Sequence, residues 1–325
     1  MKDPALRLSL VIPVYNESPG ILDAIRTMKS ELEASVGDYE IVVVDDGSTD
    51  TTWELLESQA TGDNRIKLIG FTRNFGKEAA ILAGLRYSTG EAVVVIDGDL
   101  QHPPGVLGEM VRRWREDGDE VVHARKAARQ QEPFLRRLLA AMFYRVMRVF
   151  SGYDLRDATD YKLLARRVVD HYVRLPENAR FFRGLIPWLA FRQSTVYFCP
   201  ADRQRSGSRW TVAKLFRFGI RAICSFSALP MQIVTLLGAL MFAGSFVLGF
   251  LTLYKKLSGH AIEGFSTVIL LLLLIGSMLM VSLGVIGQYL AMIYEEVKGR
   301  PAFVISRTRN ISSSTNGEGH SQMRQ

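Results

Sequence analysis

The residues best suited to chemistry are two carboxylates that follow a run of β-branched residues. Positions 93–104 read VVVIDGDLQHPP, so Asp97 and Asp99 are one residue apart at the end of a predicted strand. Carboxylates placed in this way can bind a hard dication such as Mg²⁺ against substrate phosphates, and Gln101 can add a neutral oxygen. An ordinary acidic turn has the same pattern, so the rest of the sequence has to decide between the two.

Polar residues also end the other predicted strands of this region. Residues 45–50 read DDGSTD, which is either a helix-capping turn or a second acidic wall of the same site. Residues 13–17 read PVYNE, and residues 72–77 read TRNFGK and end in Lys77. Ligands of open α/β sheets bind beyond the carboxyl ends of the strands. Together these segments predict a nucleotide diphosphate site.

The elements that must position these residues alternate regularly along the chain. Near-continuous Val/Ile runs predict strands that are covered on both faces of a parallel sheet, joined by right-handed helical crossovers. The predicted strands are 8–15, 39–47, 65–72, 91–99 and 119–126, and the predicted helices are 19–35, 51–60, 77–88 and 105–117. No GxGxxG follows the first strand, which disfavours a dehydrogenase-type dinucleotide site. We expect an α/β domain with a mostly parallel sheet over residues 1–200.

Two long stretches in the C-terminal third carry no charged residue, residues 222–254 and 265–294. Each exceeds the roughly 20 apolar residues that span a bilayer. Buried core helices are the alternative, but the second stretch is apolar on every face. We predict transmembrane helices at 229–254 and 265–294.

The charges around these stretches predict how the chain is oriented in a membrane. Basic residues precede the first span and follow the second, which places both flanks and both termini in the cytoplasm. The N-terminus lacks the pattern of a signal peptide, so residues 1–200 are expected at the inner face of the cytoplasmic membrane. The net charge of +7 is better explained by anionic lipid headgroups than by nucleic acid.

Three further segments are assigned by composition. Basic amphipathic helices are predicted at 133–150 and 211–226, and residues 201–228 are expected to lie in the membrane interface. Residues 306–325 are polar and are predicted to be a disordered tail. The two cysteines, Cys199 and Cys224, predict no disulfide framework.

Four segments that contain the motifs above, taken in order, resemble family 2 glycosyltransferases with the GT-A fold. These segments are VIPVYNE, VVVDDGSTDTT, RNFGKEAAILAGL and VIDGDLQHPP. The segments GLIPWLAFRQSTVYFCPADRQRSGSRWTVAKL, SFSALP and GVIGQYLAMIYEEVKGRP extend the resemblance over most of the chain. The fuller match is to polyprenyl-phosphate glycosyltransferases, which include dolichyl-phosphate mannose synthases and bactoprenol glucosyltransferases. The two-span architecture resembles the bacterial glucosyltransferase branch most.

The resemblance implies roles for individual residues. The nucleotide contacts would be Pro13, Tyr15, Glu17, Asp46, Lys77 and Asp97, and the metal ligands Asp97, Asp99 and Gln101. Asp160, in ATDYKLL, would be the catalytic aspartate, with Asp99 also catalytic through the metal. Tyr161 and Lys162 stand where the family usually has Phe-Arg. The acceptor phosphate would meet Arg136, Arg137, Arg203, Arg205, Ser208 and Arg209, although a serine usual in this region is Ala140 or Ala141 here.

The resemblance also implies the reaction. We expect inverting transfer of a sugar onto undecaprenyl or another polyprenyl phosphate, with Mg²⁺ or Mn²⁺. UDP-glucose is the leading donor, and mannose, galactose or a modified arabinose are the alternative sugars. Family analogy suggests a homo-oligomer such as a tetramer. Two alternatives remain at this point. A processive polysaccharide synthase would carry a QxxRW motif, for which QRSGSRW at 204–210 has the wrong spacing. A non-enzymatic membrane scaffold or flippase subunit would have no need for acids at two strand ends.

Overall fold

The computed structural model describes residues 7–18, 20–98, 105–127, 158–178, 180–199, 229–258 and 264–311. These residues form two compact units. The first holds the described residues up to 199 together with 301–311, and the second holds residues 229–300. Segment 301–311 therefore belongs to the same unit as the N-terminal domain, although the long helices separate them in the sequence.

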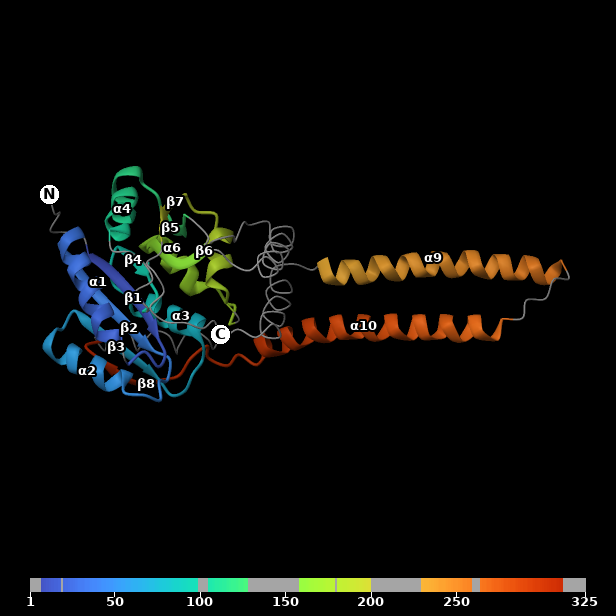
Figure 1. Ribbon diagram of the computed structural model, residues 1–325, viewed down its shortest axis with the longest axis horizontal. Helices are drawn as coiled ribbons and strands as arrows, with labels where there is room; N and C mark the ends of the chain where they lie inside the picture. Colours follow the sequence, from blue (N-terminus) through green and yellow to red (C-terminus); the bar gives the residue numbers. More distant parts are fainter. Residues whose placement is uncertain are drawn as a thin grey trace, which may run out of the picture. The chain divides into compact units, whose positions relative to one another are not determined.

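A mixed sheet of eight strands forms the centre of the first unit (Figure 1). Its order is β7-β5-β6-β4-β1-β2-β3-β8. The strands are β1 (Arg7–Val14), β2 (Asp38–Asp45), β3 (Ile66–Phe71), β4 (Ala92–Val95), β5 (Val121–Lys126), β6 (Ala158–Ala165), β7 (Gln193–Phe198) and β8 (Ile305–Arg309). Strands β1 to β4 are mutually parallel, β6 runs antiparallel between β4 and β5, and β8 runs antiparallel to β3.

Helices cover both faces of this sheet. They are α1 (Ile21–Ser35), α2 (Thr52–Gly62), α3 (Lys77–Tyr87), α4 (Val106–Arg112, continued by a π-helical turn to Asp117), α6 (Arg166–Arg174) and α7 (Phe182–Trp188). Leu10 and Ile12 of β1 pack into one core with α1, α2 and α4. Successive side chains of a strand point to opposite faces, so Val11 faces α3 instead. There a Cβ on Gly84 would lie 2.2 Å from Val11 Cγ1, and only glycine lets the helix approach this closely.

The predicted alternation of strands and helices up to residue 126 is confirmed, and the sheet is mostly parallel as expected. The prediction of a disordered tail from residue 306 is wrong for its first residues. β8 pairs with the edge strand β3, and the Asn310 side chain donates to the carbonyl oxygens of Ala60 (2.7 Å) and Ile66 (2.9 Å). The backbone groups of a segment can pair with an edge strand whatever the side chains of the segment are. A strand with polar side chains is therefore hard to recognise from composition. Residues 312–325 lie outside the described part.

The second unit consists of two long helices, α9 (Leu229–Leu257) and α10 (Phe265–Val297), which run antiparallel and side by side (Figure 1). The helices predicted at 229–254 and 265–294 are therefore present. Segments Met231–Lys255 and Leu271–Val297 are long and apolar enough to cross a membrane. Membrane crossing and its orientation stay predictions. The amphipathic helices predicted at 133–150 and 211–226, like the interfacial segment 201–228, lie outside the described residues.

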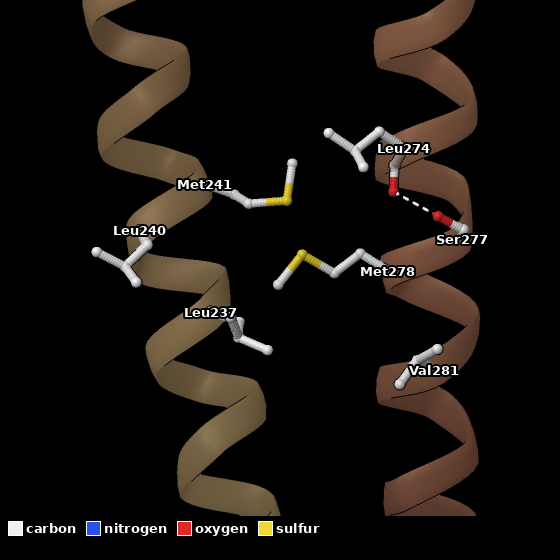
Figure 2. A pocket seen from close by; sticks show the side chains of 7 residues that line it. All are labelled: Leu237, Leu240, Met241, Leu274, Ser277, Met278 and Val281. Carbon is white, nitrogen blue, oxygen red and sulfur yellow. Dashed lines mark hydrogen bonds between the residues drawn. The ribbon is translucent and has the colours of Figure 1, made fainter.

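An apolar pocket of about 430 Å³ lies between α9 and α10 (Figure 2). It is lined by Leu237, Leu240, Met241, Leu274, Ser277, Met278 and Val281. The Ser277 hydroxyl donates to the Leu274 carbonyl oxygen of its own helix at 2.9 Å. The one polar lining group is thereby satisfied inside α10, so this pocket presents an apolar surface.

Candidate functional site

The loops after β1 and β2 are joined by hydrogen bonds at the carboxyl edge of the sheet. Asn16 adopts a left-handed conformation, with a φ of 54°, which asparagine tolerates better than most residues. Its side-chain oxygen accepts the backbone amide of Thr49 at 2.9 Å, and the Asn16 backbone amide donates to Ser48 Oγ at 2.9 Å. These contacts fix the polar turn of residues 45–50 beside Tyr15, whose side chain remains exposed.

The loop after β3 is held against the same turn. Asp46 is buried, and its carboxylate accepts the amides of Phe75 (2.7 Å) and Gly76 (2.9 Å). Burial raises the pKa of Asp46 above its ordinary value, although these two amides oppose the shift. Gly47 has a φ of +70°, and a Cβ there would lie 2.5 Å from the carbonyl carbon of Arg73. The two loops therefore form one closely packed wall.

A charged centre lies where β4 ends and β6 begins, beside the start of α3. Lys77, the first residue of α3, brings its Nζ to 2.5 Å from both Asp97 Oδ1 and Asp160 Oδ2. The register explains how two distant acids meet. Val95 pairs with Lys162 in the antiparallel ladder, so two residues further on Asp97 comes level with Asp160. Burial disfavours the charged form of Lys77, but Asp97 and Asp160 outweigh it and raise its pKa.

Arg183 of α7 binds the other side of Asp160. Its Nε donates to Oδ1 at 2.7 Å and its Nη2 to Oδ2 at 2.8 Å, the bidentate arrangement of a guanidinium on a carboxylate. Asp160 is only 4% exposed. Burial would raise the pKa of Asp160, but Arg183 and Lys77 hold it well below its usual range. Because both oxygens already accept hydrogen bonds, Asp160 is poorly suited to take a proton from a substrate.

Two further ionisable groups border this centre. Glu78 accepts the Phe182 amide at 2.9 Å, and burial raises the pKa of Glu78 to about 7. Lys162 is buried, and its Nζ donates to the Thr159 carbonyl oxygen at 2.9 Å and lies 5.0 Å from the centroid of the Phe182 ring. Burial lowers the pKa of Lys162 to about 7. The charge of the site therefore depends on pH near neutrality.

The structure brings some predicted residues together and leaves others apart or outside. Lys77, Asp97 and Asp160 meet directly, and Asp46 is buried nearby as the anchor of the loop after β3. Pro13 pairs within the sheet beside β2, and Glu17 is half-buried at the start of the next loop. The residues outside the described part are Asp99, Gln101, Arg136, Arg137, Arg203, Arg205, Ser208 and Arg209. Their assigned roles stay predictions.

Sequence reasoning did not single out Arg183 or Glu78. Arg183 lies in FFRGLIPW, where it is the one cation among aromatic and aliphatic residues. A single cation in an apolar segment could have indicated a buried ion pair. Within the described residues, no group of three or more His, Cys, Asp or Glu side chains is placed to hold a metal ion. Of the predicted ligand set, the described part contains Asp97 alone.

The mostly parallel α/β sheet, with acids and cations gathered beside the carboxyl end of β4, agrees with a GT-A-like glycosyltransferase domain. Residues 9–173 match the family described as Glycosyl transferase family 2, and the chain belongs to this family. It is 36% identical over 310 residues to Uncharacterized glycosyltransferase YkcC of Bacillus subtilis, covering 95% of this chain and 96% of that protein. The chain is a glycosyltransferase.

The chain is also similar to a second relative and to a solved structure. The chain is 31% identical over 306 residues to the Prophage bactoprenol glucosyl transferase homolog of Escherichia coli, covering 94% of this chain and 100% of that protein. A solved structure, glucosyl-3-phosphoglycerate synthase of Mycobacterium tuberculosis in complex with Mn²⁺ and UDP-glucose, is similar with a TM-score of 0.47 and 20% identity. That similarity covers 68% of this chain and 77% of the synthase chain.

Proposed function

We propose that this glycosyltransferase moves glucose from UDP-glucose onto polyprenyl phosphate at the cytoplasmic face of a membrane, with inversion at the anomeric carbon. The observation that carries the proposal is the similarity, over 94% of the chain, to a relative named for bactoprenol glucosyl transfer. That similarity includes both the sheet domain and the two apolar helices. A polyprenyl phosphate is a membrane lipid. Helices that cross the membrane would hold the enzyme beside an acceptor of this kind.

In this proposal the donor occupies the carboxyl edge of the sheet. The nucleoside lies along the wall formed by the loops after β1 and β2, against Tyr15 and Glu17. The diphosphate lies against Lys77, whose ammonium is the only described cation that reaches both Asp97 and Asp160. A flexible ammonium suits this task because it can turn from carboxylate to phosphate oxygens without leaving the site.

Asp97, Asp99 and Gln101 would hold the metal ion. The Asp97 side chain is 29% exposed and already attracts one cation, Lys77, at 2.5 Å. Carboxylate and amide oxygens are the ligands that Mg²⁺ and Mn²⁺ prefer, so the donor set fits either ion. When bound, the ion supplies positive charge for the departing UDP diphosphate.

The acceptor phosphate needs charge compensation more than it needs a base. It is an anion at neutral pH, so its oxygen attacks without prior loss of a proton. We therefore assign Asp160 to orientation rather than to proton transfer. Arg136, Arg137, Arg203, Arg205, Ser208 and Arg209 are proposed to bind the lipid phosphate through charge-assisted hydrogen bonds. A homo-oligomer remains part of the proposal.

The test is transfer of radiolabel to undecaprenyl phosphate by the full-length protein in detergent. UDP-[14C]glucose is supplied with Mg²⁺, with Mn²⁺ or with EDTA, and the lipid product is separated. We expect a labelled lipid that requires a dication and is lost in Asp99→Ala. Asp23→Ala is the matched control, because Asp23 is an exposed acid of α1 whose one ion pair within the described part of the chain is with Arg26 of its own helix.

Different results would correct different parts of the proposal. Product from another nucleotide sugar, with none from UDP-glucose, would change the donor alone. Full activity in EDTA and in Asp99→Ala would refute the metal site. No lipid-linked product from any donor, with the protein folded, would refute the polyprenyl phosphate acceptor.

A further inference from the structure

Two adjacent connections join the start of α3 to the start of α7. In the first, Lys77 and Arg183 bind the same carboxylate of Asp160. In the second, the Glu78 carboxylate accepts the Phe182 amide. The starts of α3 and α7 are thus connected through two consecutive residues of each helix, Lys77 and Glu78 in α3 and Phe182 and Arg183 in α7. This geometry determines where the Lys77 ammonium lies.

The partners of the two Asp160 carboxylate oxygens determine where the Lys77 ammonium lies. Arg183 covers Oδ1 alone and shares Oδ2 with Lys77. Lys77 therefore remains beside one oxygen of Asp160 and keeps its contact with Asp97. Without Arg183, a carboxylate that is 4% exposed would keep Lys77 as its one hydrogen-bonded cation among the described residues, since Lys162 acts on it through charge and donates its own hydrogen bond to Thr159. Lys77 is already 2.5 Å from Oδ2, so it cannot come closer. Without the Arg183 fork the carboxylate would instead be free to rotate, and the ammonium would follow it away from Asp97.

We propose that Arg183 is a positioning residue for sugar transfer, which acts through Asp160 to hold Lys77 at the diphosphate. The inference rests on the proposed function, since it needs a donor diphosphate at Lys77. Arg183 is suited to the role because its planar fork fixes the plane of the carboxylate, which a single ammonium does not do. Its side chain is 39% exposed, so it reaches the carboxylate from the rim of the site.

The experiment compares Arg183→Gln and Arg183→Lys with Arg180→Gln in the full-length protein. Arg180 is the matched control, because it lies three residues earlier and donates to backbone carbonyls at the end of α6, including Tyr172 and Leu175. We expect Arg183→Gln to lower kcat by about 100-fold, the scale for a misplaced catalytic group. Arg183→Lys should recover part of this loss, and Arg180→Gln should keep kcat while lowering thermal stability.

A double variant separates positioning from a structural role. If Arg183 acts through Asp160, then Arg183→Gln has no further effect on kcat in an Asp160→Asn background. Effects that multiply in the double variant would overturn the inference, as would an unchanged kcat in Arg183→Gln. An equal loss of kcat in Arg180→Gln would also overturn it, because disturbance of the α7 segment would then explain the result.

The proposed function and this inference fail in different ways. Absence of lipid transfer by the unaltered protein, with every donor, would overturn the proposed function and this inference with it. Normal transfer by the unaltered protein, with a normal kcat in Arg183→Gln, would overturn the inference alone. A raised KM for the donor together with a lowered kcat supports it, because Lys77 is proposed to contact the diphosphate both before and during transfer.

Discussion

Replacing Gly47 by alanine tests how closely the loops after β2 and β3 are packed. The backbone at Gly47 has a φ of +70°, a conformation that costs an L-residue about 1–2 kcal/mol. The new Cβ would also lie 2.5 Å from the Arg73 carbonyl carbon and 2.8 Å from the Asn74 nitrogen. Both are backbone atoms, so the loop after β3 has to move to relieve the clash.

The expected loss of stability combines the two effects. Overpacking of this kind costs about 1–3 kcal/mol, which with the backbone strain gives a loss of about 2–5 kcal/mol in the free energy of unfolding. For a domain of this size the thermal midpoint should fall by roughly 4–20 °C. UDP affinity should fall as well, because the displaced loop leads directly into Lys77.

Two glycines provide controls for the separate effects. Gly118 has the same φ of +70°, but its nearest contact for a Cβ is an Arg192 side-chain atom at 3.9 Å, so Gly118→Ala should show the backbone strain alone. Gly62 has an ordinary backbone and nothing within 4 Å, so Gly62→Ala should leave the midpoint unchanged or slightly raised. The midpoints are measured by tryptophan fluorescence in detergent, and UDP affinity by calorimetry. A Gly47→Ala midpoint equal to that of Gly118→Ala would refute the close packing.

Three further outcomes are expected. Asp46→Asn removes the charge that anchors the loop after β3, so UDP affinity measured by calorimetry should fall about tenfold or more, in line with the roughly 1.5–3 kcal/mol of a charged hydrogen bond; unchanged affinity would contradict this. Phe303→Ala removes a ring stacked on Phe71 at 5.0 Å and should lower the free energy of unfolding by at least the roughly 0.5–1.5 kcal/mol of such a ring pair; a midpoint equal to the parent's would show that this ring pair adds nothing. Burial alone would raise the pKa of Glu40, but hydrogen bonds from Lys67 and its neighbours hold it below 4.5, so its stabilisation is present above pH 4.5 and is lost as the pH falls through the folded-state value. Unfolding of Glu40→Gln should therefore depend less on pH in the acid range below pH 4.5, and an unaltered acid profile would exclude this role.

The α/β class, the order of the early elements and the apolar helices follow from local patterns in the sequence. Runs such as VVVI at 93–96 predict a strand because β-branched side chains favour one and tolerate burial on both faces. The long uncharged stretches predict helices because their length and composition need no knowledge of partners. Asp97 and Lys77 were recognisable for the same reason, since Asp97 lies at the end of a predicted strand and Lys77 begins a predicted helix.

The tertiary structure alone decided which charges meet. Asp160 comes level with Asp97 because β6 inserts antiparallel beside β4, and no local pattern predicts that register. Arg183 was missed because its partner lies 23 residues away in the sequence, and Glu78 because its partner lies 104 residues away. A single charged residue in a helix gives no indication of such a distant partner. Likewise β8 reads as a polar tail until the unpaired edge of β3 is seen beside it. Backbone pairing and buried ion pairs satisfy groups that are distant in sequence, so they become visible only when the chain is folded.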